Sequence, residues 1–323
     1  MSERPFLIGR APASASLPPP ENARPDWIGA DPGKIERALR HATAKPSGGW
    51  CVIDGRRAIA RGPVPYTILG RELVAWSCKK GPALAPEACP HMGAQLSTGF
   101  VDDRGRIVCP WHGLALSADR KQGDWAPIPT YDDGVLFWAR FDELLAPGEA
   151  PTERPYLPVR PERALDAVIR MEARCAPEDV IANRLDPWHG AHFHGHSFAR
   201  LSVIDEAIDH VTVRVVYRIA GRVGMEVDAR FDCPDPRTIV MTIVSGEGVG
   251  SVVETHASPL AEGRTAIVEA TIATSERTSV SWLPRATLLR PMIEARARKL
   301  WVEDVQYCER RYALRTQAAA QGA

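Results

Sequence analysis

The sequence predicts a protein of the α+β class, in which a small all-β domain precedes an antiparallel sheet that carries a long C-terminal helix. The chain has 323 residues, about twice a typical domain of roughly 150 residues. Short strand-like runs separated by Gly and Pro fill residues 47–145, and longer runs rich in β-branched residues follow. A pattern rich in Arg, Ala, Glu and Leu over residues 289–314 predicts the closing helix. A helix packed on a sheet is a stable layered arrangement.

Composition and charge exclude several classes of protein. Lys+Arg and Asp+Glu are both 40, so the formal net charge is zero, which argues against nucleic acid or a membrane surface held by bulk charge. No apolar run reaches the roughly 18 residues of a transmembrane helix. The 7 cysteines are scattered and odd in number, which favours a reducing compartment and predicts a cytoplasmic location.

The N-terminal region should contain a tail and one helix. Residues 1–25 hold six prolines among Ala and Ser and predict a mobile tail. The apolar run Phe6–Ile8 is too short for a secretory signal. Asp31 followed by Pro32 is typical of an N-capped helix, which should end before Pro46.

The predicted all-β domain, residues 47–145, is built from short strands separated by turns. The linker Ala146–Pro151 should separate it from a second domain over residues 152–315. Its strand candidates are Trp50–Ile53, Tyr66–Leu69, Leu73–Trp76, Arg106–Val108 and Val135–Trp138.

The second domain should contain an antiparallel sheet of about six or seven strands. A helical segment over residues 177–190 interrupts the strands, and residues 316–323 should form a tail. The strand candidates are 167–173, 211–219, 225–231, 238–244, 249–255 and 265–274.

The first metal-binding pattern is C-x-H-x17-C-x2-H, formed by Cys89, His91, Cys109 and His112. Each loop mixes one Cys with one His, so two thiolates can bind one iron and two imidazoles the other. The alternative is a Cys2His2 structural zinc site, in which like ligands are usually paired at other spacings. The pattern resembles the Rieske [2Fe-2S] domain. Met92 and Leu114 depart from the residues common in ring-hydroxylating members, which leaves the substrate class open.

The second pattern lies at residues 183–196 and reads N-x2-D-x2-H-x4-H. Two imidazoles and one carboxylate form the facial triad of non-haem Fe(II) oxygenases, which leaves positions open for O2 and substrate. The spacing of Asp186, His189 and His194, with Asn183 three residues before Asp186, resembles the mononuclear-iron motif of Rieske non-haem iron oxygenases. The alternative is a chance cluster or a weak zinc site, and His192 and His196 have no assigned role.

The third iron ligand should come from the C-terminal helix. At about 100° per residue, Asp304 shares a face with Trp301 and Cys308, whereas Glu303 points away from them. We therefore expect Asp304 to be the ligand, with Glu303 as the alternative. The segment Trp301–Cys308 also resembles the closing helix of the family, where an Asp completes the triad.

The resemblance covers residues 47–315 and is closest to the α-subunits of short, α-only mono-oxygenases and demethylases. It implies a helix-grip (START-like) catalytic domain, a [2Fe-2S] cluster, a mononuclear Fe(II) and O2 as co-substrate. It also implies electrons from NAD(P)H through a separate ferredoxin or flavin reductase, and a homotrimer in which the cluster of one subunit serves the iron of its neighbour. Residues 182–190 further resemble a subfamily associated with carotenoid gene neighbourhoods, which implies an apolar substrate.

The resemblance gives Asp186 the role of a bridge between a Rieske histidine of the neighbouring subunit and His189. The alternative role for Asp186 is a turn or cap residue before Pro187. Two other functions stay open for the whole chain. One is an electron-transfer Rieske protein whose second domain binds a ligand without catalysis, and the other is a ligand-binding scaffold with structural metals.

Overall fold

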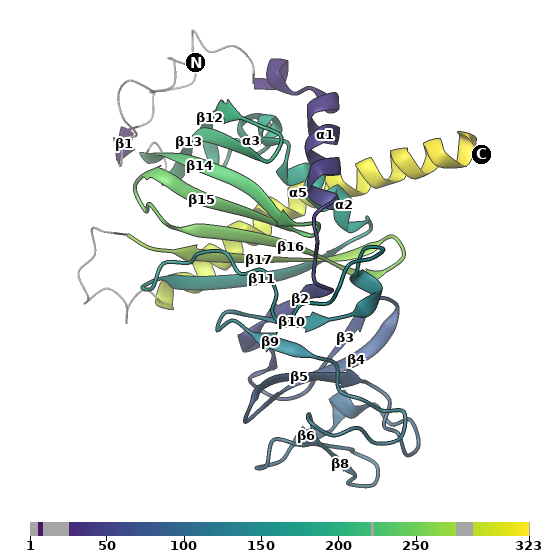
Figure 1. Cartoon of the computed structure of the whole chain (residues 1–323). Helices are drawn as coiled ribbons and strands as arrows, with labels where there is room; N and C mark the ends of the chain where they lie inside the picture. Colours follow the sequence, from purple (N-terminus) through teal and green to yellow (C-terminus); the bar gives the residue numbers. More distant parts are fainter. Residues whose placement is uncertain (1–5, 9–25, 221–222, 276–286, 323) are drawn as a thin grey trace.

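The computed structural model describes residues 6–8, 26–220, 223–275 and 287–322. Two units lie end to end in Figure 1, a small β unit and a larger sheet covered by helices. This architecture confirms the α+β class and the order of the two domains predicted from the sequence. Among the described residues, no helix is long and apolar enough to cross a membrane.

The small unit consists of three short antiparallel sheets whose apolar side chains pack inward. Ile53, Leu84 and Phe137 are fully buried there, because alternate residues of each strand face the core. The sheets are β2 (Trp50–Gly55), β10 (Leu136–Arg140) and β9 (Thr130–Asp132); β3 (Val64–Ile68), β4 (Arg71–Cys78) and β5 (Gly81–Pro86); and β6 (Phe100–Val101), β7 (Ile107–Val108) and β8 (Ala115–Leu116).

The large unit is built on one sheet, in the order β11-β17-β16-β15-β14-β13-β12. Every neighbouring pair on this path is antiparallel, as predicted. The strands are β11 (Leu165–Ala173), β12 (Phe198–Glu206), β13 (His210–Ala220), β14 (Val223–Asp235), β15 (Thr238–Gly246), β16 (Val252–Ala261) and β17 (Arg264–Ala273).

One sequence expectation about this sheet was wrong, and one of its strands was not predicted. Strand β1 (Phe6–Ile8) pairs in parallel with Val223–Met225 of β14, so these three residues are not part of a mobile tail. Residues 1–5 and 9–25 of the predicted tail lie outside the described residues. Strand β12 was not predicted, because an edge strand with exposed Asp205 and Glu206 lacks a clean apolar alternation.

The helices confirm one prediction and correct two. Helix α1 (Pro32–Thr43) starts as predicted, with the Asp31 carboxylate accepting a hydrogen bond from the Gly33 amide at 2.8 Å. The single helical segment predicted over 177–190 is divided into α2 (Pro177–Arg184), a 3-10 turn (Pro187–His189) and α3 (Gly190–Phe193). The break falls at Asp186, since a residue before proline disfavours the helical conformation.

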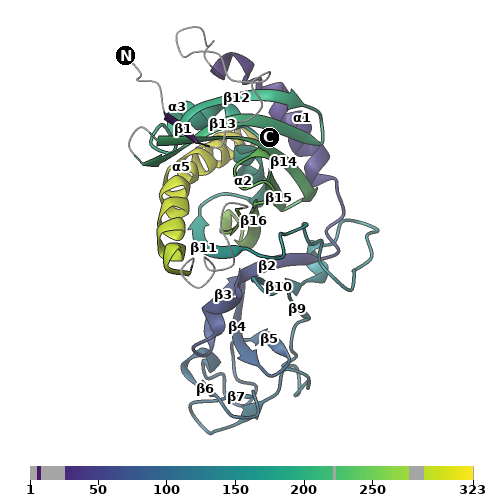
Figure 2. The same cartoon turned by 90° about the vertical axis from the view of Figure 1, so that its left-hand side faces the viewer.

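The closing helix, α5 (Arg290–Gly322), is longer than predicted, so the expected tail at 316–323 is helical up to residue 322. Figures 1 and 2 show α5 running along the sheet, and in Figure 1 its C-terminal end projects beyond the sheet. Trp301 and Cys308 of α5 are buried against α2 and the sheet. Asp179 of α2 is fully buried and forms ion pairs with Arg311 and Arg315 of α5, which fixes the two helices together.

The two units also contact each other through polar groups. Arg160 forms an ion pair with Asp133 of the small unit at 2.9 Å and with Glu254 of β16 at 2.5 Å. The amides of Leu69 and Gly70 donate to the carbonyls of Pro259 and Leu260. The two amide hydrogen bonds join the β3–β4 turn to the end of the sheet where β16 turns into β17.

Candidate metal centres

The predicted cluster ligands lie on two loops with the same local geometry, at the far end of the small unit. In the first loop, the Cys89 amide donates to Ala94 O at 2.9 Å and the Gly93 amide to Cys89 O at 2.8 Å. In the second, the Cys109 amide donates to Leu114 O at 2.9 Å and the Gly113 amide to Cys109 O at 3.1 Å. The two glycines have φ values of 75° and 71°, which favour glycine. Each loop therefore presents its Cys and His in the same way.

The four side chains converge with their sulfurs inside and their imidazoles outside. Cys89 and Cys109 are each 3% exposed, whereas His91 and His112 are exposed. The two imidazole rings lie 4.8 Å apart. This donor set, two thiols beside two imidazoles, fits a Rieske cluster.

Backbone amides donate hydrogen bonds to both sulfurs. Burial raises the pKa of Cys89, and hydrogen bonds from the His91 and Met92 amides oppose this rise. Burial also acts to raise the pKa of Cys109, but the Trp111 and His112 amides outweigh it and lower the pKa. Amide donors to cluster sulfurs tune the reduction potential.

The second site lies between the α2–α3 segment and α5. One oxygen of Asp304, Oδ1, lies 2.9 Å from His194 Nε2 and 3.2 Å from His189 Nε2. One ligand atom from each of these three residues lies within 4.8 Å of the others. Asp304 and His194 are each 2% exposed. The geometry therefore brings together the two histidines and the aspartate singled out in the sequence.

Neighbouring polar groups hold this triad in place. Asn183, which is fully buried, donates from Nδ2 to Asp304 Oδ1 at 3.0 Å. Glu303 Oε2 lies 2.7 Å from His194 Nδ1, and Glu303 Oε1 lies 3.6 Å from His196 Nδ1. Glu303 thus contacts the outer nitrogen of His194, whereas Asp304 meets both inner nitrogens.

Asp186 lies beside His189 but does not hydrogen-bond to it. Asp186 Oδ2 is 3.9 Å from His189 Nδ1 and accepts a hydrogen bond from the Tyr307 hydroxyl at 3.3 Å. Among the described residues, Asp186 Oδ1 and His189 Nδ1 are buried without a hydrogen-bond partner. Buried polar atoms are rarely left unpaired, so these two atoms are an exception within the fold.

At the triad, the carboxylates stabilise the protonated form of His189, and the two histidines stabilise the ionised form of Asp304. Burial acts to lower the pKa of His189, but the carboxylates of Asp186 and Asp304 outweigh it and raise the pKa to about 9. Burial acts to raise the pKa of Asp304, but hydrogen bonds with His189 and His194 hold it well below its usual value. An anionic carboxylate between two imidazoles is a donor set suited to a divalent cation.

Sequence reasoning missed Tyr307, whose ring lies 5.5 Å from that of His189, tilted by 32°. Its position three residues after Asp304 on α5 was the available signal, because residues three apart share a helix face. His192, which had no predicted role, is exposed.

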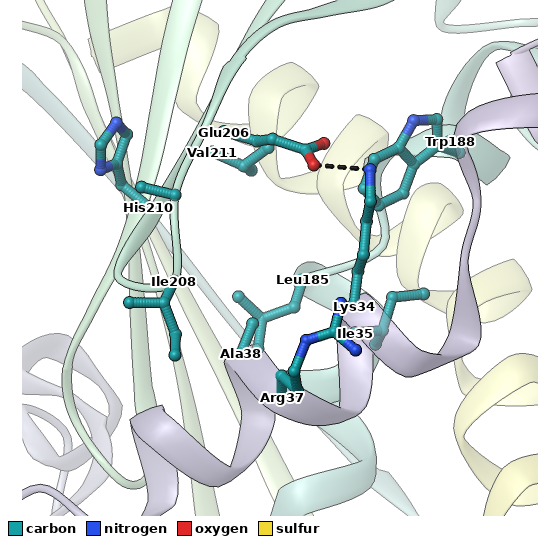
Figure 3. Close-up of a pocket in the computed structure, with 11 residues that line it drawn as sticks. Lys34, Ile35, Arg37, Ala38, Leu185, Trp188, Glu206, Ile208, His210 and Val211 are labelled. Carbon is teal, nitrogen blue, oxygen red and sulfur yellow. Dashed lines mark ion pairs between the residues drawn. The ribbon is translucent and has the colours of Figure 1, made fainter.

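A separate pocket of about 270 Å³ lies between α1 and the β12–β13 hairpin. Figure 3 shows Lys34 reaching toward Glu206, and these two residues form an ion pair at 2.6 Å. Its lining includes Leu185 and Trp188, the neighbours of Asp186 and His189, but none of the three triad residues. The pocket is therefore distinct from the second site.

Comparisons with known proteins agree with this architecture. Residues 146–319 match the model of a family described as a domain of unknown function (DUF5914), which spans more than half of the chain, and residues 49–137 match the Rieske [2Fe-2S] domain.

Two curated proteins resemble shorter stretches. The vanillate O-demethylase oxygenase subunit of Pseudomonas sp. is 36% identical over 77 residues, which are 24% of this chain and 22% of that protein. The chloroplastic pheophorbide a oxygenase of Arabidopsis thaliana is 40% identical over 56 residues, which are 17% of this chain and 10% of that protein. The chain thus matches about a fifth or less of the length of these curated relatives.

Solved structures match over most of the chain. The structure of dicamba monooxygenase bound to dicamba matches with a TM-score of 0.61 at 17% sequence identity. The matched region covers 85% of this chain and 90% of the dicamba monooxygenase chain. The structure of NdmA of Pseudomonas putida CBB5 with caffeine matches with a TM-score of 0.51 at 16% sequence identity. The matched region covers 81% of this chain and 83% of the NdmA chain. At these identities the likeness shows the fold. The resemblance stated from the motifs is confirmed, and the chain belongs to the DUF5914 family, whose domain it joins to a Rieske [2Fe-2S] domain in the fold of the Rieske oxygenases.

Proposed function

We propose that this chain is the terminal oxygenase component of a Rieske non-haem iron system. It receives electrons through its [2Fe-2S] cluster, holds a mononuclear Fe(II) with His189, His194 and Asp304, and uses O2 to oxidise a small, largely apolar organic substrate. The observation that carries the proposal is the shared contact of both imidazole Nε2 atoms with one buried carboxylate oxygen.

The donor set fits iron in a facial triad. Two neutral imidazoles and one carboxylate leave positions open for O2 and substrate. The outer nitrogens of both histidines face carboxylates, with His194 Nδ1 2.7 Å from Glu303 and His189 Nδ1 3.9 Å from Asp186. A carboxylate at hydrogen-bond distance, such as Glu303, fixes the tautomer and orientation of a metal-binding imidazole. When bound, the iron supplies the one-electron and O2 chemistry that side chains lack.

The residues of the chain orient and shield this chemistry. The Asn183 amide fixes Asp304 Oδ1, and the buried α2–α5 contact keeps the ligands of both helices in register. The helix-facing side of β13–β15 is lined with apolar side chains. This lining excludes water and favours an apolar substrate. Hydroxylation, dealkylation and desaturation all remain compatible with such a site.

We propose that electrons pass between two copies of the chain. In Figure 1 the β6–β8 end of the small unit, with the cluster loops, and α3 lie at opposite ends of the molecule. A head-to-tail homotrimer would bring the exposed His91 or His112 of one copy to Asp186 of the next. The unpaired Asp186 Oδ1 supports this role, because it can accept a hydrogen bond from an incoming imidazole.

The electron donor is proposed to be a separate ferredoxin or flavin reductase that draws on NAD(P)H. Support comes from the exposed cluster imidazoles and from Met92 and Trp111 beside them, which are 64% and 62% exposed. Exposed apolar side chains of this kind mark protein interaction surfaces. All 7 cysteines are free, which supports a reducing, cytoplasmic location.

The relatives favour mono-oxygenation over dioxygenation. The names of the similar proteins include an O-demethylase oxygenase subunit and a monooxygenase. We therefore propose chemistry of the mono-oxygenase or demethylase type for this chain.

The experiment that tests the function needs no knowledge of the substrate. Anaerobic, reduced protein is exposed to nitric oxide, a stand-in for O2 that gives a distinct EPR signal on a mononuclear Fe(II) with an open position. The proposal predicts that signal in the wild type and its loss in His189→Ala, with the Rieske signal retained in both. A Rieske signal without any nitric oxide signal in iron-loaded wild type would favour an electron-transfer protein instead.

A further inference from the structure

Arg184 is a positively charged residue next to the second site. It follows Asn183, and its guanidinium carbon lies 5.5 Å from the ring centre of Phe231 and 5.8 Å from that of Trp301. Among the described residues it forms no ion pair, and its Nε is buried without a hydrogen-bond partner. An arginine over two aromatic rings is held in place, and no described residue accepts a hydrogen bond from the guanidinium of Arg184.

Glu269 is a carboxylate on the same face of the sheet. It is 6% exposed, and its Oε2 accepts a hydrogen bond from Trp301 Nε1 at 2.7 Å. Its other oxygen, Oε1, forms no hydrogen bond with a described residue. Burial raises the pKa of Glu269, and the charge of Arg184 offsets this only in part. Trp301 therefore contacts both groups and lies between them.

Strand register places these groups on one surface. Phe231, Met241, Val253 and Thr271 lie directly opposite one another across β14–β17. Glu269 lies two residues before Thr271, so the period of two puts it on the same face. Tyr217 is close enough to both groups for their charges to act on its pKa. Burial raises the pKa of Tyr217 to about 12, the charge of Arg184 opposes this rise, and the charge of Glu269 adds to it. Phe231, Val253, Thr271, Tyr217 and Arg184 all retain solvent-accessible surface although α2 and α5 cover this side of the sheet.

The chemistry of the two groups selects a ligand class. While Glu269 is ionised, a carboxylate ligand would pair with Arg184 but be repelled by Glu269, and a ketone could accept from Arg184 but offer nothing to Glu269 Oε1. A hydroxyl both accepts and donates. We propose that Arg184 and Glu269 bind the hydroxyl group of the substrate, so that the substrate is an alcohol with an otherwise apolar body. This inference rests on the proposed oxygenase function and specifies its substrate class.

The position of the pair also sets where oxidation occurs. Trp301 precedes Asp304 by three residues, a rise of about 4.5 Å along the helix. Arg184 likewise adjoins Asn183, which donates to Asp304 Oδ1. A hydroxyl held by Arg184 and Glu269 would therefore place nearby carbons of the same small molecule at the iron. The two residues act as positioning and specificity groups, and the reacting atoms lie elsewhere.

The test measures binding, without reductant or turnover. Menthol, menthone and p-menthane share one carbon skeleton and carry a hydroxyl, a carbonyl or no polar group. Their binding to oxidised holoprotein is measured by headspace depletion. We expect menthol to bind roughly tenfold more tightly than p-menthane and more tightly than menthone, as a hydrogen bond to a charged group contributes at least this factor.

Variants then assign the preference. Arg184→Met should remove most of the preference for menthol, and Glu269→Gln, whose amide oxygen is a weaker acceptor, should remove part of it. Both should leave p-menthane binding unchanged, and Arg184→Lys should keep part of the preference. Arg71→Met is the matched control, because Arg71 also stacks on an aromatic ring, Phe141 at 5.1 Å, but lies in the small unit. The Rieske absorption and the melting temperature confirm that each variant is folded.

Three results would overturn the inference. Menthol could bind no better than p-menthane, menthone could equal menthol, or Arg184→Met could weaken all three probes alike, as a purely structural arginine would. Hydroxyl-selective binding in a protein that shows no nitric oxide signal would leave the inference intact and count against the oxygenase function alone.

Discussion

The two candidate metal centres differ in how the chain presents them. The cluster ligands lie on tight loops, with buried thiols and exposed imidazoles, whereas the ligands of the second site lie on helical segments, with His194 and Asp304 each 2% exposed. An exposed imidazole can transfer electrons to another protein at the surface. A buried triad can keep O2 chemistry away from water. Under the proposed function, the exposed site would exchange electrons with partners and the buried site would perform the reaction.

The largest expected effects separate the two sites. Cys89→Ala should remove the Rieske absorption and EPR signal, because one iron loses a thiolate. His189→Ala should abolish turnover and leave that signal intact. Absorption spectra, EPR and metal content check both variants. A colourless Cys89→Ala protein that still turns over would refute the electron path.

The next prediction identifies the carboxylate ligand. Asp304→Ala should lower iron occupancy of the second site by at least about tenfold, since Asp304 Oδ1 meets both histidines. Glu303→Gln should retain iron, because Glu303 contacts only the outer nitrogen of His194. Iron analysis after dialysis distinguishes the two. Loss of iron in Glu303→Gln alone would assign the ligand to Glu303.

A smaller effect is expected at the link between the sites. Asp186→Asn should keep both metals but slow electron transfer to the iron, seen as slower oxidation of the reduced cluster in single-turnover stopped-flow experiments. Tyr307→Phe keeps the ring near His189 and loses only the hydroxyl that donates to Asp186, so its rate should fall less. An unchanged rate in Asp186→Asn would contradict the bridging role.

The smallest effect concerns stability at the junction of the two units. Burial acts to raise the pKa of Asp133, but Arg160 outweighs it and lowers the pKa. A carboxyl with a depressed pKa binds fewer protons when folded, so its stabilisation is present above its unfolded pKa of about 3.9 and is lost as pH falls through the folded value. At pH 7, Asp133→Asn should therefore lower the free energy of unfolding by about 2 kcal/mol.

Thermal melts at pH 7 and at lower pH check this prediction. The destabilisation caused by Asp133→Asn should shrink as the wild-type carboxyl becomes protonated. Asp119→Asn is the control, because its pair with Lys80 is exposed and should matter little. A destabilisation that persists unchanged in acid would rule out the charge as its cause.

Local patterns in the sequence predicted which residues lie together at the two candidate sites. The Cys–His spacings contain their own turns, since Gly93 and Gly113 each follow a cysteine by four residues and close a loop of fixed geometry. Helical periodicity was enough to favour Asp304 over Glu303 for the buried face. The strands β13–β17 were predicted because their β-branched residues alternate on a covered sheet.

Features set by distant contacts were not predictable. Strand β1 depends on a partner more than two hundred residues away, Val223–Met225, and β12 is an edge strand whose polar side chains hide its pattern. Glu269 was not a candidate from the sequence, because nothing in the sequence shows that Trp301 contacts both Glu269 and Arg184. Pairwise contacts of this kind depend on the tertiary fold.

The most direct test of the central claim is metal analysis with EPR on anaerobically purified protein, before and after dithionite. A [2Fe-2S] cluster and a mononuclear site together predict about three irons per chain and a rhombic Rieske signal that appears on reduction. Zinc in place of iron, with no such signal, would contradict the account.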